Sequence, residues 1–306
     1  MPAAQVWGRP QGEPPVQLGV IGLGSMGGGM ARSAAKAGLS VRGYDVRPTA
    51  LDGVTAAGSP AEAAEAADIL LVMVVNAKQL EDALFGTNGA LSALPKGAVV
   101  VSSATIPTAD AERVGTRVEQ GGHLYLDAPV SGGSARAGTG ELTFMASGSD
   151  AAFAKAQPML DACAAKVFRL GPKIGTGSTV KTVHQLLAGV HIAAAAEAMA
   201  LGVRAGADAR ELFEVISNAA GRSWMFENRV PHMLERDFTP HSAVEIFVKD
   251  LGLVLDTGRD LRFPLPIAAS AHQQFLAAAA AGLGGEDDSA VVKVYEQLAG
   301  IEVKGS

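Results

Sequence analysis

The stretch VQLGVIGLGSMG, residues 16–27, decides the fold of this chain. Residues 16–22 form an apolar run of strand length, and the glycines that follow have the spacing G-x-G-x-x-G and open a helical segment over 25–37. In this context the first glycine permits a tight turn, the second lets a pyrophosphate approach the backbone, and the third lets helix and strand pack closely. N–H groups at the helix N-terminus can then bind the phosphates. We interpret the turn as a dinucleotide-binding loop rather than a structural glycine turn, with members Gly22, Leu23, Gly24, Ser25, Met26 and Gly27.

The next apolar segment, 40–45, ends on Asp45, roughly 20 residues beyond the last glycine of the turn. A carboxylate at this position binds the ribose hydroxyls of NAD and repels the 2′-phosphate of NADP. Arg47 leaves NADP open as the alternative, because a nearby arginine can accommodate that phosphate. The sequence therefore favours NAD over NADP.

Further strand-length segments follow at similar intervals, over residues 69–75, 98–102, 124–128, 141–147 and 166–170. Continuous apolar strands separated by helical stretches indicate a parallel sheet that is buried on both faces. Right-handed crossovers make such a sheet doubly wound. We therefore expect an α/β Rossmann-type domain over residues 16–172, preceded by a flexible leader over 1–15.

The pattern changes after Gly171, where a loop rich in glycine precedes segments with helical patterns only. The longest helix is expected over 178–205, with Ser178 or Thr179 as its N-cap. The acidic run 286–288 is interpreted as charge and capping at the start of the last helix. This half of the chain is therefore predicted to be an all-α substrate and oligomerisation domain over 173–306. Its other helices are expected over 209–218, 224–235, 242–261, 266–281 and 289–298.

Composition excludes several classes of partner. The 306 residues are 48% hydrophobic and carry a formal net charge of −6, which supports a core and argues against general nucleic-acid binding. The single cysteine, Cys163, excludes a disulfide framework and fits a reducing, cytoplasmic location. We expect no membrane-spanning segment and no secretory signal. We also expect no metal site, because His184 and His191 have no evident third ligand.

Two further segments indicate a substrate site. The loop DAPVSGG, residues 127–133, follows a strand directly, and ligands of doubly wound sheets bind beyond the carboxyl ends of the strands. Ser131 and the backbone N–H groups of Gly132 and Gly133 can hydrogen-bond a carboxylate, although a structural turn is the alternative. Lys181 is placed in the first turn of the long helix, where burial beside the helix dipole would lower its pKa toward that of a general base. A solvated lysine is the alternative there.

The motifs GLGSMG, DAPVSGG, the G-x-x-x-K turn and FVKDLGL (247–253) occur together in this order. As a set they resemble the β-hydroxyacid dehydrogenase family, which includes 3-hydroxyisobutyrate dehydrogenase and tartronate semialdehyde reductase. The resemblance covers nearly the whole chain from Val16. It implies an NAD-dependent dehydrogenase, a C-terminal domain like that of 6-phosphogluconate dehydrogenase, and a homodimer or homotetramer. Within the family, segments 183–201, 223–232 and 285–293 are most similar to the branch that acts on L-threonate.

The resemblance also implies roles for individual residues. Lys181 matches the catalytic lysine, and Ser131, Gly132 and Gly133 match the loop that binds the substrate carboxylate. The cofactor contacts are expected to include Val74, Val75, Thr105 and Lys249, the last of these on the nicotinamide side.

Two more residues are expected to contact the substrate. Trp224 would be a core residue on composition, whereas the resemblance makes it a wall of the pocket. His184 stands where the family usually has asparagine and would titrate near neutrality. This departure weakens any simple transfer of 3-hydroxyisobutyrate as the substrate.

These observations predict NAD-dependent oxidation of a small hydroxy acid, with Lys181 as general acid and base. L-threonate, oxidised to 2-dehydro-L-erythronate (2-oxo-tetronate), is the best substrate. The alternatives are the activities of 3-hydroxyisobutyrate dehydrogenase and of tartronate semialdehyde (2-hydroxy-3-oxopropionate) reductase. A catalytically silent dinucleotide-binding module is a remote alternative, disfavoured by the presence of Lys181.

Overall fold

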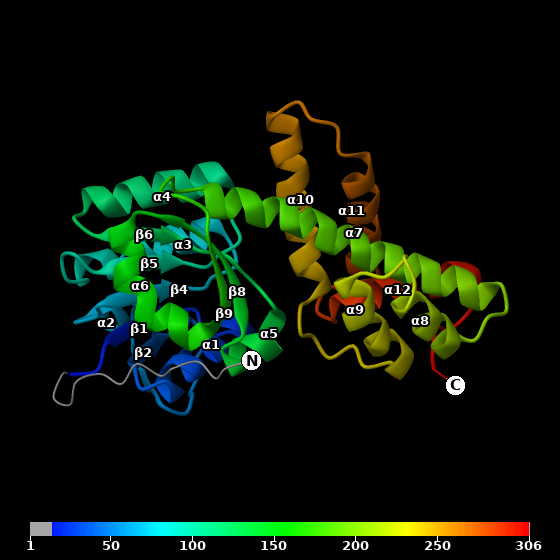
Figure 1. The fold of residues 1–306 in the computed structure, drawn as a ribbon, viewed down its shortest axis with the longest axis horizontal. Coiled ribbons are helices and arrows are strands. Elements are labelled where there is room, and N and C mark those ends of the chain that lie inside the picture. Colours follow the sequence, from blue (N-terminus) through cyan, green and yellow to red (C-terminus); the bar gives the residue numbers. More distant parts are fainter. Residues whose placement is uncertain (1–13, 306) are drawn as a thin grey trace.

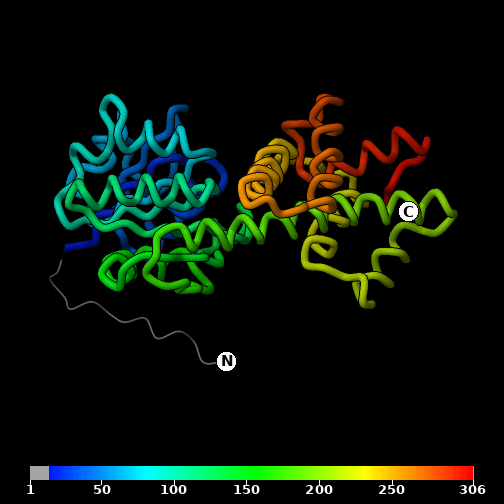
Figure 2. The backbone as a smooth tube through the Cα atoms, turned by 90° about the horizontal axis from the view of Figure 1, so that it is seen from above, coloured from blue at the N-terminus to red at the C-terminus, as the bar shows by residue number. Residues whose placement is uncertain are grey.

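The computed structural model describes residues 14–305, so most of the predicted leader lies outside the described residues. Figure 1 shows an α/β part and a helical part, connected by one long helix that extends from the first into the second. The same helix runs along both parts in the view from above (Figure 2). This arrangement is the predicted Rossmann-type domain followed by an all-α domain.

The sheet has the strand order β3-β2-β1-β4-β5-β6-β8-β7, with β9 beside β8. Strands β1 to β6 are all parallel, as predicted. Strand β8 is antiparallel to β6, so the predicted parallel sheet has an antiparallel pair at this edge. The connection from β6 to β8 contains β7 and the 7-residue helix α5, and β7 also pairs antiparallel with β8. The strands are β1 (Gln17–Ile21), β2 (Ser40–Tyr44), β3 (Val54–Ala56), β4 (Ile69–Val72), β5 (Val99–Ser102), β6 (Leu124–Asp127), β7 (Val130–Ser131), β8 (Leu142–Gly148) and β9 (Ala164–Arg169).

Alternate residues of each central strand point into separate apolar layers. Val20 and Leu71 pack on one face with Met30 of α1, whereas Leu70 and Val72 pack on the other face. Cys163 is buried in the first of these layers, as predicted. Both faces of the sheet are therefore buried, which is why the sequences of its strands are continuous apolar runs. The helices of this domain are α1 (Ser25–Lys36), α2 (Pro60–Ala64), α3 (Ala77–Phe85), η1 (Ala90–Ser92), α4 (Thr108–Gln120), α5 (Gly133–Thr139) and α6 (Asp150–Cys163).

The second domain is built around α7 (Thr176–Arg204), which packs against α9, α10, α11 and α12. By length and composition α7 could cross a membrane, a property that the sequence analysis did not assign to it. Five of its alanines and Met199 belong to the apolar core of this domain, the alanines being Ala188, Ala193, Ala195, Ala196 and Ala200. The remaining helices are α8 (Ala209–Ser217), α9 (Trp224–Glu235), α10 (Val244–Asp260), α11 (Pro266–Ala278), η2 (Ala279–Leu283), η3 (Asp288–Val291) and α12 (Val292–Ala299).

A buried carboxylate determines where α7 begins. Asp127, the last residue of β6, accepts hydrogen bonds from the N–H groups of Gly175 (3.1 Å) and Ser178 (2.8 Å) and from the Ser178 hydroxyl (2.7 Å). The helix therefore starts at Thr176, after Gly175 with φ of +91°, and the predicted cap at Ser178 or Thr179 is wrong. Lys181 consequently lies in the second turn rather than the first.

Candidate active site

The glycine turn has the geometry that a dinucleotide needs. A Cβ atom on Gly22 would collide with the carbonyl of Met73, and one on Gly27 would collide with the carbonyl of Gly22. A Cβ on Gly24 would meet no heavy atom within 4 Å, and no side chain caps α1 at this residue. Packing thus requires the first and third glycines, whereas the second leaves open space before the N-terminus of α1. The turn fits a pyrophosphate at that place.

Asp45 lies beside the turn, as predicted. One of its carboxylate oxygens accepts the N–H of Leu23 at 2.8 Å, and the other accepts the N–H of Arg47 at 2.9 Å. The Arg47 side chain is 84% exposed and its guanidinium is 4.0 Å from the carboxylate. The residues that bear on the choice between NAD and NADP therefore lie together at the carboxyl end of β2.

Lys249, from the helical domain, binds the carboxyl ends of two neighbouring strands. Its ammonium donates to the carbonyl of Val75 at 2.9 Å and to the carbonyl of Thr105 at 3.2 Å. Strand β4 ends at Val72 rather than at Val75, so Val74 and Val75 lie in the loop that follows it. The structure thus brings together the predicted cofactor contacts Val75, Thr105 and Lys249.

Lys181 is buried, and its amine belongs to a polar chain inside the protein. The amine donates to Oε1 of Gln185 at 2.7 Å, and Nε2 of Gln185 donates to Asp250 at 2.5 Å. The second oxygen of Asp250 lies 2.8 Å from the ammonium of Lys249. The predicted base and the predicted cofactor-side lysine are therefore connected through Gln185 and Asp250.

Burial lowers the pKa of Lys181 from 10.5 to about 8. The positive charge of Lys249 also lowers it, whereas the negative charge of Asp250 raises it. The sequence analysis ascribed the lowered pKa to burial beside the helix N-terminus. Burial is indeed the largest cause of the lowered pKa, although Lys181 lies one turn further along α7 than expected.

His184, on the same helix, does not titrate near neutrality as the sequence analysis expected. Burial and the charge of Lys181 lower the pKa of its imidazole to about 4, although Asp250 acts in the opposite direction. The ring is therefore neutral at pH 7. A neutral imidazole has one N–H donor and one acceptor nitrogen, so it can bind a hydroxyl without adding charge.

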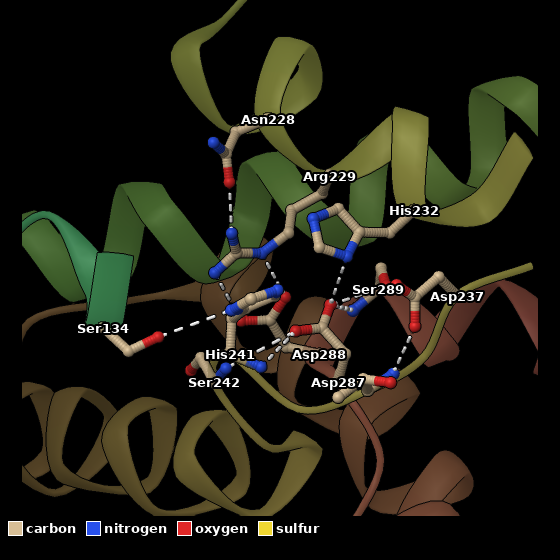
Figure 3. Close-up of polar contacts among 11 residues, drawn as sticks. Ser134, Asn228, Arg229, His232, Asp237, His241, Ser242, Asp287, Asp288 and Ser289 are labelled. Atoms are coloured by element: carbon tan, nitrogen blue, oxygen red, sulfur yellow. Dashed lines mark hydrogen bonds and ion pairs between the residues drawn. The ribbon is translucent and has the colours of Figure 1, made fainter. Parts of the chain in front are cut away.

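The predicted carboxylate loop ends where the helical domain approaches it. Gly132 and Gly133 have φ of +135° and +74°, values that favour glycine, and α5 begins at Gly133. The hydroxyl oxygen of the next residue, Ser134, lies 3.4 Å from Nδ1 of His241 (Figure 3). Trp224 is 48% exposed near the guanidinium of Arg136, so the interpretation as a core residue is wrong for it.

A buried acidic pair holds the segment that carries His241 (Figure 3). Asp287 accepts the N–H of His241 at 3.0 Å and caps η3 through the N–H and hydroxyl of Ser289, as the sequence suggested. Asp288 instead pairs with Arg229 through both carboxylate oxygens, at 2.5 and 3.1 Å. Burial raises the pKa of Asp288 to about 6, against the opposing charge of Arg229.

The sequence analysis assigned no site role to Gln185 or Asp250. A signal was available, because Asp250 occupies the buried stripe of α10 together with Phe247, Leu251 and Val254. A carboxylate on an apolar helix face requires a partner. Gln185 could have been found because it lies one turn beyond Lys181.

Other parts of the described chain offer weaker sites. Within residues 14–305 no group of three or more His, Cys, Asp or Glu side chains could hold a metal ion. Two hollows on the surface, one beside Phe85 and Arg117 and one beside Ile174, contain none of the predicted site residues. The predicted site residues therefore lie outside both hollows.

Comparisons with known proteins agree with this arrangement. Residues 17–171 match the model of the NAD binding domain of 6-phosphogluconate dehydrogenase, and residues 175–295 match that of the NAD-binding domain of NADP-dependent 3-hydroxyisobutyrate dehydrogenase. The chain belongs to the β-hydroxyacid dehydrogenase family. It is accordingly a dehydrogenase that acts on a CH–OH group of a small hydroxy acid with a nicotinamide dinucleotide.

Within this family the chain is similar to L-threonate dehydrogenase of Cupriavidus necator, with 56% identity over 94% of this chain and 98% of the relative. A solved structure of 3-hydroxyisobutyrate dehydrogenase from Salmonella typhimurium is 51% identical, with a TM-score of 0.86 over 91% of this chain and 99% of that one. Human mitochondrial 3-hydroxyisobutyrate dehydrogenase is 34% identical over 92% of this chain and 87% of the relative.

Proposed function

We propose that this chain oxidises L-threonate with NAD to 2-dehydro-L-erythronate, the 2-oxo acid. The observation that carries the proposal is the buried amine of Lys181, with a pKa of about 8, connected to Lys249 at the carboxyl ends of β4 and β5. The choice of L-threonate is supported by the similarity of this chain to L-threonate dehydrogenase of Cupriavidus necator.

The cofactor, when bound, accepts a hydride from the carbinol carbon of the substrate. Lys181 in its neutral form takes the hydroxyl proton as the carbonyl group forms, and returns a proton in the reverse direction. Ser131 and the N–H groups of Gly132 and Gly133 hold the carboxylate, which places the carbinol carbon and fixes the substrate's orientation. In this proposal Trp224 closes the side of the pocket.

His184 is proposed to bind a hydroxyl of the substrate. As a neutral ring it can donate to or accept from a hydroxyl at pH 7. L-Threonate has hydroxyl groups beyond the reacting carbon, whereas 3-hydroxyisobutyrate has a methyl group and no such hydroxyl. This difference favours L-threonate over 3-hydroxyisobutyrate. Tartronate semialdehyde reduction stays a second candidate because its product also has a hydroxyl beside the reacting one.

Three finer assignments belong to the same proposal. We propose NAD rather than NADP, because the Asp45 carboxylate lies at the turn, whereas the Arg47 side chain is exposed to solvent. We propose a homodimer or homotetramer, supported by the exposed apolar residues Val183 and Leu187 on α7. We propose a cytoplasmic location, supported by the free and buried thiol of Cys163.

The test is a substrate panel with the purified protein, read as absorbance of the reduced cofactor. We expect the highest kcat/KM with L-threonate and NAD, and lower values with 3-hydroxyisobutyrate or with NADP. The variant His184→Asn is expected to lower kcat/KM for L-threonate more than for 3-hydroxyisobutyrate. A preference of the native protein for 3-hydroxyisobutyrate, or equal losses in the variant, would contradict the substrate assignment.

A further inference from the structure

The polar chain between Lys181 and Lys249 contains two buried residues to which the proposed reaction gives no role. Gln185 touches Lys181 on one side and Asp250 on the other, and Asp250 touches Lys249. Gln185 and Asp250 are 7% and 2% exposed, so each hydrogen bond is made away from water. An arrangement of this kind is costly unless every member has a matched partner.

Asp250 determines which way the Gln185 amide points. Paired with the ammonium of Lys249, the carboxylate offers only acceptor oxygens. Gln185 must therefore present its NH₂ group to Asp250 and its carbonyl oxygen to Lys181. The orientation of an amide is set by such neighbours, because its two ends are nearly alike in shape.

The orientation matters for a base. A neutral amine has two N–H bonds and one lone pair. The carbonyl oxygen of Gln185 can only accept an N–H of Lys181, which leaves the lone pair free. If the amide were turned, its NH₂ group would donate to the lone pair and occupy the position that a substrate proton needs.

We propose that Asp250 is a positioning residue, which fixes the Gln185 amide so that the lone pair of Lys181 stays open to the substrate hydroxyl. The same carboxylate also holds Lys249 against the carbonyls of Val75 and Thr105. The buried carboxylate of Asp250 thus positions both Lys181, through Gln185, and Lys249. The inference rests on the proposed role of Lys181 as the base.

Asp250→Asn tests the proposal directly. The ammonium of Lys249 would bind the oxygen of the introduced amide, whose NH₂ group would then face Gln185 and turn it. We expect kcat to fall by about 10²-fold, the loss typical of a misplaced catalytic group. We also expect the acidic limb of the pH profile to move below that of the native protein, because the negative charge of Asp250 raises the pKa of Lys181.

The double variant Gln185→Glu/Asp250→Asn is the matched control. The carboxylate then lies next to Lys181 and can only accept, and the introduced amide donates to it while its oxygen faces Lys249. The lone pair of the neutral amine is open again, so kcat on the alkaline plateau of the pH profile is expected to recover to within about tenfold of native. Its acidic limb moves above the native one, since an anion now touches the amine.

The charged and titratable groups near Lys181 are His184 on α7 and Lys249 and Asp250 on α10, with Asp127 of β6 bound one turn earlier at Ser178. Only Asp250 and Gln185 change in these variants. A merely structural defect would lower kcat in both and move their limbs in the same direction. That outcome, or an Asp250→Asn protein with kcat within twofold of native, would overturn the proposal.

A second readout does not depend on turnover. Competitive acetylation of the cofactor-free proteins with acetic anhydride, followed by mass spectrometry of the Lys181 peptide, reports the pKa of this amine. We expect the pKa to be lowest in Asp250→Asn, intermediate in the native protein and highest in the double variant. If the native protein oxidised no hydroxy acid but the three pKa values kept this order, the proposed function would be wrong and the proposed role of Asp250 beside Lys181 would remain supported. Any other order of the pKa values would overturn the proposed role of Asp250.

Discussion

Lowering the pH below 8 is expected to slow the oxidation progressively, because an increasing share of the proposed base then carries a proton. A pKa of about 8 leaves about a tenth of the Lys181 amine neutral at pH 7, roughly 300 times the neutral fraction of a lysine with the ordinary pKa of 10.5. We therefore expect kcat/KM for oxidation to rise about tenfold per pH unit up to about 8 and to level off above it. The assay is the initial rate of cofactor reduction between pH 6 and 10.

Variants of Lys181 identify the group whose titration causes this rise of kcat/KM with pH, the acidic limb of the profile. Lys181→Ala is expected to lower kcat by about 10²–10⁴-fold and to leave the dissociation constant of NAD nearly unchanged. Lys181→Arg is expected to lose as much, since a guanidinium keeps its proton at every pH in the assay. Lys173→Ala removes an exposed lysine that pairs with Glu112 and serves as the control, with native activity expected.

Two results would refute the reasoning. A limb above pH 9.5 would mean that burial does not lower the pKa of the amine in solution. Half the native turnover in Lys181→Ala would mean that another group takes the proton.

The remaining predictions concern the cofactor loop and the buried pair. Gly27→Ala is expected to lower the free energy of unfolding by about 1–3 kcal/mol because its Cβ meets a backbone carbonyl. Gly24→Ala is expected to lower it by under about 1 kcal/mol and to weaken NAD binding. Thermal denaturation and cofactor titration check both variants, and equal effects of the two would contradict the assignment. Asp45→Ser is expected to shift kcat/KM toward NADP, and an unchanged ratio would mean that the ribose is bound elsewhere. Arg229→Met leaves Asp288 without its partner and is expected to cost about 3–5 kcal/mol near pH 7. This loss is expected to shrink as the pH falls toward 6, because Asp288 without Arg229 gains its proton above the native pKa of about 6. A loss that is independent of pH in chemical denaturation argues against this cause.

Local patterns in the sequence were enough to predict most strands of the sheet and the position of the glycine turn. Apolar runs such as 69–72 reflect burial on both faces, which acts on every residue of the strand. The need for glycine at Gly22 and Gly27 comes from close contacts near the same strand-turn-helix unit, so a short stretch of sequence is enough to show it. The antiparallel β8 was missed because strand direction depends on how the chain returns, not on the strand's own residues.

The sequence by itself determined the residue types available for chemistry: the glycine turn, the acid after β2 and the lysine on α7. Only the tertiary structure decided their state. Asp127 sets the start of α7 from 48 residues away in the chain, and Gln185 reaches Asp250 across 65 residues. Desolvation and the charges of neighbours fix the pKa of an amine or an imidazole, and these depend on which elements pack around it. The neutral state of His184 and the free lone pair proposed for Lys181 are therefore properties of the folded chain, which no stretch of sequence contains.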